Sequence, residues 1–117
     1  MKPKTIFLDI DGTILCHMGD VHKIMTLDSF VLEGVVNKII EWNKKNYNII
    51  LTTGRKESMR RVTEKQLERE GIVYDKLIMG LGGGQRIVIN DVKPEETEPS
   101  AKAIVVLRNK GLEDINI

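Results

Sequence analysis

The sequence predicts an α/β fold in which one doubly wound parallel sheet forms a single domain over residues 1–117. Short β-prone apolar runs alternate with amphipathic helical segments in the first half of the chain, and further β-prone runs follow in the second half. Polar clusters follow the ends of several of these runs, as they do in open parallel sheets. With 117 residues and 41% hydrophobic content, the chain can bury one ordinary core but not two independent ones.

The first half of the chain predicts two strand–helix units. The first strand is expected at Thr5–Leu8, where an apolar run ends at an Asp-Gly turn signal. An amphipathic helix is expected over 30–42, with polar residues at 43–46 as its exit. The second strand is expected at 48–52, and a more polar helix runs from Met59 to Glu70 and closes at Gly71. This order is typical of parallel strands joined by right-handed crossovers.

The second half contains three further strand candidates, at 77–79, 87–89 and 103–107. Ligands of open parallel sheets bind beyond the carboxyl ends of the strands. Three polar clusters are expected there, namely 9–13 after the first strand, 53–55 after the second and 90–91 after the candidate strand 87–89. The sequence therefore predicts one site built from all three.

Asp9 and Asp11 predict a metal site at the end of the first strand. They are two residues apart, so the pleat lets both carboxylates lean toward the same space, where they repel each other. A hard divalent cation relieves this repulsion, and oxygen ligands without neighbouring His or Cys favour Mg²⁺ over zinc. Asp91 is expected to complete the cage.

The same residues predict phosphoryl transfer. One carboxylate can attack phosphorus while the other gives a proton to the leaving oxygen and later takes one from water. Thr53 and the backbone amides after Asp9, beginning at Ile10, are expected to hydrogen-bond the transferred group. Gly54 and Arg55 continue the second cluster and are further candidates for substrate binding.

Three segments, FLDIDGT, ILTTGR and VINDVKP, resemble motifs I, II and IV of the haloacid dehalogenase superfamily. The stretch KQLEREGIVYDKLIMG is similar to small bacterial members found with surface-sugar biosynthesis. The resemblance implies a Rossmann-like fold, with Asp9 as nucleophile, Asp11 as acid/base and Thr53 as phosphate ligand. It also implies Mg²⁺ held by Asp9, the backbone carbonyl of Asp11, and Asp91.

The gaps between the motifs are too short for the superfamily's cap domains, so the chain resembles a capless member. The resemblance implies a phosphomonoesterase acting on a phosphorylated sugar or another small metabolite. A nucleotide or a polynucleotide 3'-phosphate is the second substrate class. An open site of this kind could be covered by a neighbouring subunit of a homo-oligomer.

Two positions depart from the superfamily pattern. Many relatives carry two acids where this chain has Asn90 and Asp91, so the metal cage has one charge fewer. The loop 80–85 lacks the usual Lys or Arg, which leaves Arg86 and Lys93 as the candidate cations. Lys93 lies two residues after Asp91 of the third cluster, whereas a straight strand over 87–89 would place Arg86 at its remote end. The pattern therefore favours Lys93 as the catalytic cation and leaves Arg86 as a substrate-binding residue.

The alternatives are structural or non-enzymatic. Each motif alone could be an ordinary turn, and a weakly active or regulatory phosphate-binding module is the competing class. Cys16, His17 and His22 could bind a metal but lack a fourth ligand. A net charge of +1 argues against nucleic acid and anionic membranes as partners. One cysteine, with no signal peptide or membrane span in the sequence, predicts a cytoplasmic protein.

Overall fold

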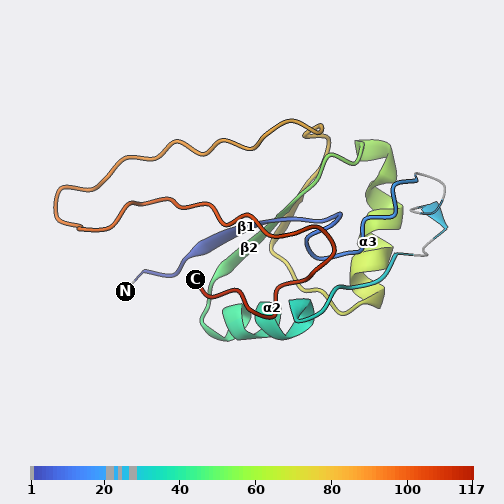
Figure 1. Cartoon of the computed structure of the whole chain (residues 1–117), viewed down its shortest axis with the longest axis horizontal. Coiled ribbons are helices and arrows are strands. Elements are labelled where there is room, and N and C mark those ends of the chain that lie inside the picture. The colour runs from blue at the N-terminus through green and yellow to red at the C-terminus, as the bar shows by residue number, and fades with distance from the viewer. Residues whose placement is uncertain (1, 21–22, 24, 27–28) are drawn as a thin grey trace.

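A three-stranded parallel sheet forms the centre of the chain. The computed structural model describes residues 2–20, 23, 25–26 and 29–117. The strands β1 (Thr5–Asp9), β2 (Asn48–Thr52) and β3 (Lys76–Ile78) are hydrogen-bonded in that order. Asp9 at the end of β1 is the register partner of Thr52 at the end of β2. The predicted parallel sheet is therefore confirmed for the first three strands, and the ends of β1 and β2 lie side by side (Figure 1).

Two described helices connect these strands. Helix α2 (Val35–Lys44) begins after Gly34, whose φ of 76° few other residues adopt, and it starts later than the pattern predicts. A short 3₁₀ helix, η1 (Glu57–Met59), leads into α3 (Arg60–Arg69). Gly71, with a φ of 74°, ends α3 as predicted. Both connections advance the chain in the same direction across the sheet, so crossovers of the same hand lie on the same face.

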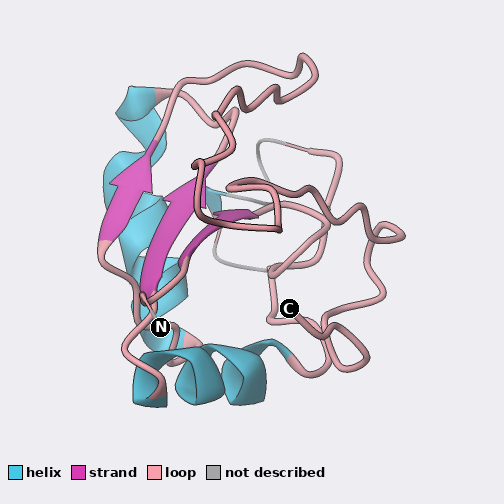
Figure 2. Ribbon diagram, turned by 90° about the vertical axis from the view of Figure 1, so that its left-hand side faces the viewer, coloured by secondary structure: helices cyan, strands magenta, loops and turns pink. Residues whose placement is uncertain are grey.

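The core lies between this face and the helices. Leu8, Leu51 and Leu77 project from the three strands into it, and Ile39 and Leu67 contribute from α2 and α3. The opposite face is different, because Phe7 is 60% exposed and Ile78 is 41% exposed. Figure 2 shows one helix behind the strands, a second helix below them, and long loops above and to the right. The second helical layer of a doubly wound sheet is not among the described residues.

The predicted strands at 87–89 and 103–107 are wrong. These segments instead form two legs of an extended arm, which projects beyond the sheet in Figure 1. Their side chains are largely exposed, with Ile89 at 89% and Val105 at 94%. High β-propensity predicts a strand only where another strand supplies backbone partners, and these runs lie outside the sheet. No helix of the described residues is long and apolar enough to cross a membrane.

Candidate functional site

The loop after β1 carries the first candidate residues and is shaped by its own backbone. The carbonyl of Ile10 accepts hydrogen bonds from the N–H groups of Thr13, Ile14 and Leu15 at 3.0–3.1 Å. Gly12 has a φ of 92°, which explains why glycine occupies the turn. Ile10 itself is fully buried, so its side chain cannot contact a ligand. Its predicted role in substrate binding is thus limited to its backbone.

Asp9 presents its carboxylate at the carboxyl end of β1. Thr13 Oγ1 donates to Asp9 Oδ2 at 3.3 Å, and the backbone of Ile10 provides a further hydrogen bond. The residue keeps exposed surface, yet burial of its carboxyl raises its pKa. The negative charge of Asp11 raises the pKa further, whereas the two hydrogen bonds and the charge of Arg86 lower it. Asp9 is therefore accessible and close to a cation.

Asp11 has a different environment, because Arg55 holds both of its oxygens. Arg55 Nε donates to Asp11 Oδ2 at 2.8 Å and Nη2 donates to Oδ1 at 2.7 Å. The other side of the guanidinium donates from Nη1 to Thr63 Oγ1 at 2.9 Å and to Gln66 Oε1 at 2.7 Å. The Arg55 side chain is only 3% exposed and that of Asp11 is 20% exposed. Helix α3 thus fixes the orientation of Asp11 through Arg55.

This arrangement corrects the predicted role of Arg55. A guanidinium that is buried and engaged with three side chains has no free face for a substrate. Arg55 is instead a positioning residue for Asp11. The sequence contained a partial indication of this role for Arg55. Thr63 and Gln66 are polar residues on the buried side of α3, and a buried charge needs such hydrogen-bond partners.

Thr53 and Gly54 shape the end of β2. Thr53 is 1% exposed, its hydroxyl accepts the N–H of Arg55 at 3.0 Å, and its backbone bonds to Ile78 and Leu81. A Cβ at Gly54 would lie 2.7 Å from the carbonyl oxygen of Gly82, so only glycine permits this approach. Both residues therefore hold the glycine-rich loop 80–84 against β2.

Sequence reasoning missed Thr52. Register partners on parallel strands project from the same face, so the Thr52 side chain lies on the same face as that of Asp9. Thr52 is half-buried and its hydroxyl donates to the carbonyl of Leu8 at a long 3.4 Å. It is thus better placed than buried Thr53 to meet a ligand at Asp9. Strand register, which the sequence does not contain, distinguishes the two threonines.

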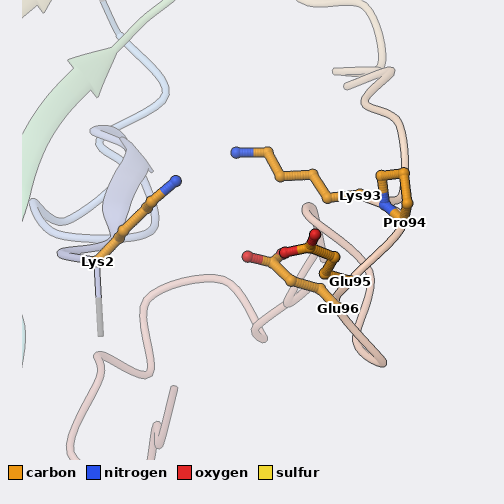
Figure 3. A pocket seen from close by; sticks show the side chains of 5 residues that line it. All are labelled: Lys2, Lys93, Pro94, Glu95 and Glu96. Carbon is orange, nitrogen blue, oxygen red and sulfur yellow. The ribbon is translucent and has the colours of Figure 1, made fainter.

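Arg86 and Lys93 lie at different ends of the molecule. The loop 80–84 turns Arg86 toward the site, where its charge lowers the pKa of Asp9, and its guanidinium donates to the carbonyls of Gly82 and Gly84. Lys93 lies in the arm with Pro94, Glu95 and Glu96, and together they line a shallow pocket with Lys2 (Figure 3). Lys2 precedes β1, so this pocket is at the amino end of the sheet. The structure thus places Arg86 nearer to Asp9 than Lys93, and the strand over 87–89 on which the argument for Lys93 depended does not form.

Asn90 and Asp91 also belong to the arm. Asn90 Nδ2 donates to the carbonyl of Ser100 at 3.3 Å, and Ser100 Oγ donates to the carbonyl of Asp91, so both residues bind the opposite leg. Among the described residues, no three His, Cys, Asp or Glu side chains gather as a metal cage. The structure therefore brings Asp9 and Asp11 together but leaves the predicted third ligand in the arm. His22, one of the residues considered for a softer metal site, lies outside the described residues.

Of the two carboxylates at the end of β1, that of Asp9 is the more available to a metal, because only one of its oxygens accepts a side-chain hydrogen bond. Both oxygens of Asp11 accept from Arg55, which leaves its backbone carbonyl as the other candidate oxygen. Mg²⁺ commonly uses one or two carboxylates and keeps several waters, with substrate phosphate completing the shell. The donors present fit a hydrated magnesium ion of that kind, and they do not fit a cage made of protein groups alone.

Comparisons with solved structures find chains of similar fold. No protein-family model matches the sequence, and no curated protein matches it either. A chain in the structure of the Pnkp1/Rnl/Hen1 complex is similar with a TM-score of 0.60 and 26% sequence identity, over 73% of this chain and 30% of that one. A crystal structure of a Vibrio cholerae protein gives a TM-score of 0.56 and 17% identity, over 78% of this chain and 84% of that one. The chain thus spans about a third of the first of these proteins, and it shares with both a small parallel α/β fold.

Proposed function

We propose that this chain is a phosphomonoester hydrolase of the haloacid dehalogenase type that acts through an aspartyl-phosphate on Asp9. The observation that carries the proposal is the accessible carboxylate of Asp9 at the carboxyl end of β1, with a hydroxyl donor at Thr13 and the charge of Arg86 nearby. An anionic nucleophile needs such neighbours to approach a phosphate, because they offset the charge of the transferred group.

The reaction would occur in two balanced steps. An oxygen of Asp9 attacks phosphorus, the bond from phosphorus to the ester oxygen breaks, and Asp11 gives its proton to that oxygen. Water then attacks the aspartyl-phosphate while Asp11 takes its proton, which releases inorganic phosphate and restores Asp9. Mg²⁺ bound at Asp9 would supply Lewis-acid stabilisation of the phosphate oxygens.

The ion pair with Arg55 constrains the role of Asp11. Both oxygens of the Asp11 carboxylate accept hydrogen bonds from the Arg55 guanidinium. Before Asp11 can donate a proton, one of these hydrogen bonds must open. We therefore expect the acid step, and not the attack by Asp9, to be sensitive to the Arg55 network.

Hydrolysis of p-nitrophenyl phosphate with added Mg²⁺ tests the proposal. The wild-type chain should release phosphate, Asp9→Asn should be inactive, and Asp114→Asn, which changes an exposed aspartate elsewhere, should match the wild type. A phosphoryl group transferred from labelled substrate should be removable by hydroxylamine and absent from the Asp9→Asn protein. Substantial turnover by Asp9→Asn would exclude the covalent mechanism.

A phosphate-binding module without turnover is the second candidate. It is favoured by the position of Asp91, which bonds to Ser100 in the arm and does not join Asp9. Such a module would bind inorganic phosphate in calorimetry with equal affinity before and after Asp91→Asn, and it would hydrolyse no phosphate ester. A phosphorylated sugar or other small metabolite is the substrate class that the sequence resemblance favours for the enzyme.

A further inference from the structure

The segment 107–112 crosses the loop that follows Asp9, although nearly one hundred residues separate them in sequence. The N–H of Asn109 donates to the carbonyl of Gly12 at 2.8 Å, and Asn109 Oδ1 accepts the N–H of His17 at 2.7 Å. Asn109 has a φ of 63°, a conformation that asparagine tolerates better than most residues. The two hydrogen bonds of Asn109 therefore attach this segment to the loop at Gly12 and at His17.

Arg108 is placed on Gly12 by this attachment. A Cβ built on Gly12 would lie 3.2 Å from Arg108 Cγ and 3.8 Å from Arg108 Nε, so the side chain extends along the glycine. Arg108 is exposed, and within the part of the chain that the structure describes its guanidinium makes no hydrogen bond or ion pair. An unpaired cation thus lies beside the loop that carries Asp9 and Asp11.

Arg86 and Arg108 affect the site differently. Arg86 is the arginine whose charge lowers the pKa of Asp9, so it lies on the side of the nucleophile. Arg108 has no such effect on Asp9 and lies over Gly12, toward His17. The two cations therefore serve different positions, one at the nucleophile and the other beyond the turn.

We infer that Arg108 forms a second anion-binding position, and that the substrate is a phosphomonoester that carries a second phosphate group. This inference rests on the proposed phosphatase function and adds the substrate class. Arginine suits this purpose because its planar guanidinium binds phosphate oxygens through two parallel N–H donors. A sugar bisphosphate, a nucleoside bisphosphate and a polynucleotide ending in a 3'-phosphate share this chemistry.

Paired substrates test the inference. For each of a hexose 1,6-bisphosphate, a nucleoside 3',5'-bisphosphate and a short oligonucleotide 3'-phosphate, kcat/KM is divided by the value for the corresponding compound with one phosphate. In the wild type this preference ratio should exceed one for at least one pair, and that pair identifies the source of the second phosphate. Arg108→Ala should lower the ratio about tenfold or more, and Arg108→Lys should retain part of it.

Lys110→Ala is the matched control, because it removes an exposed cation two residues away without touching Gly12. It should leave the preference ratio unchanged. Equal loss of preference in the Arg108→Ala and Lys110→Ala proteins would indicate a general electrostatic field and would overturn the inference. A wild-type ratio of one for all three pairs would overturn it as well.

A binding measurement separates this inference from the proposed function. Calorimetric titration of the Asp9→Asn protein with the preferred bisphosphate, or with all three if no turnover occurs, requires no catalysis. Affinity should fall about tenfold on adding Arg108→Ala and should be unchanged on adding Lys110→Ala. If the wild type hydrolyses p-nitrophenyl phosphate but Arg108→Ala alters neither affinity nor preference, the second position is wrong and the phosphatase remains. If binding depends on Arg108 in a chain without turnover, the second position stands and the phosphatase is wrong.

Discussion

Arg55 and Asp11 form a two-pronged ion pair that joins the end of β2 to the loop after β1. Both contacts are below 2.9 Å, and the arginine is buried against Thr63 and Gln66 of α3. The orientation of Asp11 therefore depends on α3, although this helix contributes none of the candidate catalytic residues.

Replacing Arg55 should cost both stability and acid catalysis. Arg55→Ala should lower the free energy of unfolding by about 3–5 kcal/mol, because it removes the hydrogen bonds of Arg55 to the Asp11 carboxylate and to the buried side chains of Thr63 and Gln66. Denaturant unfolding measures this loss, with Arg61→Ala on the exposed side of α3 as the control. A double-mutant cycle with Asp11→Asn should give a coupling energy above about 1 kcal/mol. Additive effects of the two substitutions on the free energy of unfolding would mean that the ion pair contributes nothing to stability.

The milder variant Thr63→Val tests positioning without removing the charge. It deletes one acceptor of Arg55 Nη1. We expect kcat to fall more for alkyl phosphates than for p-nitrophenyl phosphate, since a good leaving group needs less proton donation. The same loss for both substrates would contradict a link between Thr63 and acid catalysis.

Asp9→Asn should stabilise the fold at neutral pH while it removes activity. Burial raises the pKa of Asp9 above its ordinary value, so the folded chain holds this proton more tightly than the unfolded chain. Tighter proton binding stabilises the folded chain fully at a pH below the pKa that Asp9 has in the unfolded chain. This stabilisation is lost as the pH rises through the pKa of Asp9 in the folded chain. Thermal melts should therefore show a gain for Asp9→Asn at pH 7 that shrinks toward pH 3. A constant gain across this range would contradict the pKa shift.

The raised pKa also predicts the acidic limb of the pH–rate profile. Because the nucleophile must be ionised, kcat/KM should fall as the pH drops through the pKa of Asp9, which lies above that of an exposed aspartate. Arg86→Ala should move this limb to higher pH, since the positive charge of Arg86 lowers the pKa. A shift in the other direction would exclude Arg86 from the surroundings of Asp9.

Arg86→Ala should reduce kcat/KM by about tenfold or more, whereas Lys93→Ala should leave it near the wild-type value. Such a loss corresponds to about 1.4 kcal/mol of transition-state stabilisation. The physical reason is that Arg86 acts on Asp9, whereas Lys93 lines a pocket with Lys2 at the other end of β1. Side-by-side kinetics of both variants decide the assignment. An inactive Lys93→Ala protein would show that the arm takes another position during catalysis.

Hydrolysis should require Mg²⁺ and should stop when a chelator is added. With Asp9 as the more available carboxylate, most of the magnesium shell must come from water and substrate phosphate. We therefore expect calorimetry to detect much tighter magnesium binding in the presence of phosphate than in its absence. Zinc should substitute poorly, because His and Cys are not among the donors. Full activity in chelator would remove magnesium from the proposal.

Gly111→Ala should loosen the segment that carries Arg108. A Cβ at Gly111 would lie 2.1 Å from the carbonyl oxygen of Glu33, and its φ of 84° adds a backbone cost of about 1–3 kcal/mol. Gly71→Ala is the matched control, because Gly71 has a φ of 74° but no atom near its Cβ position. The melting temperature should fall further for Gly111→Ala than for Gly71→Ala. Equal decreases would show that the close approach to Glu33 is easily relieved.

The sequence was sufficient for β1, β2, β3 and the end of α3 because each has a local cause. Apolar runs end at Asp-Gly and Thr-Gly turns, and Gly71 adopts the positive φ that closes a helix. The two strands expected at 87–89 and 103–107 were wrong because this prediction also used only local sequence. Ile87, Val88 and Ile89 have strong β-propensity, but a strand also requires a neighbour in the sheet, and local composition does not specify one.

The part of the candidate site that depends on neighbouring residues in the sequence could also be predicted. Asp9 and Asp11 share a strand end, so their proximity follows from a spacing of two residues. The partner of Asp11 was not predictable, because the ion pair with Arg55 joins residues 44 positions apart. Arg108 was equally hidden, since its place over Gly12 depends on backbone hydrogen bonds of Asn109. Such contacts arise from the tertiary packing of segments distant in sequence.

The position of β1 at the border of the sheet has a consequence for handling the protein. One edge of β1 pairs with β2, and no other strand of the described residues pairs with the opposite edge, so its backbone donors and acceptors could be used by a strand from another molecule. Phe7 presents an apolar ring on the face without a helix, which favours such association. Lys2, Pro3 and Lys4 precede the strand, where charge repulsion and a missing N–H disfavour such pairing. Solubility should therefore fall when these lysines are neutralised, even though the fold and the site are unchanged.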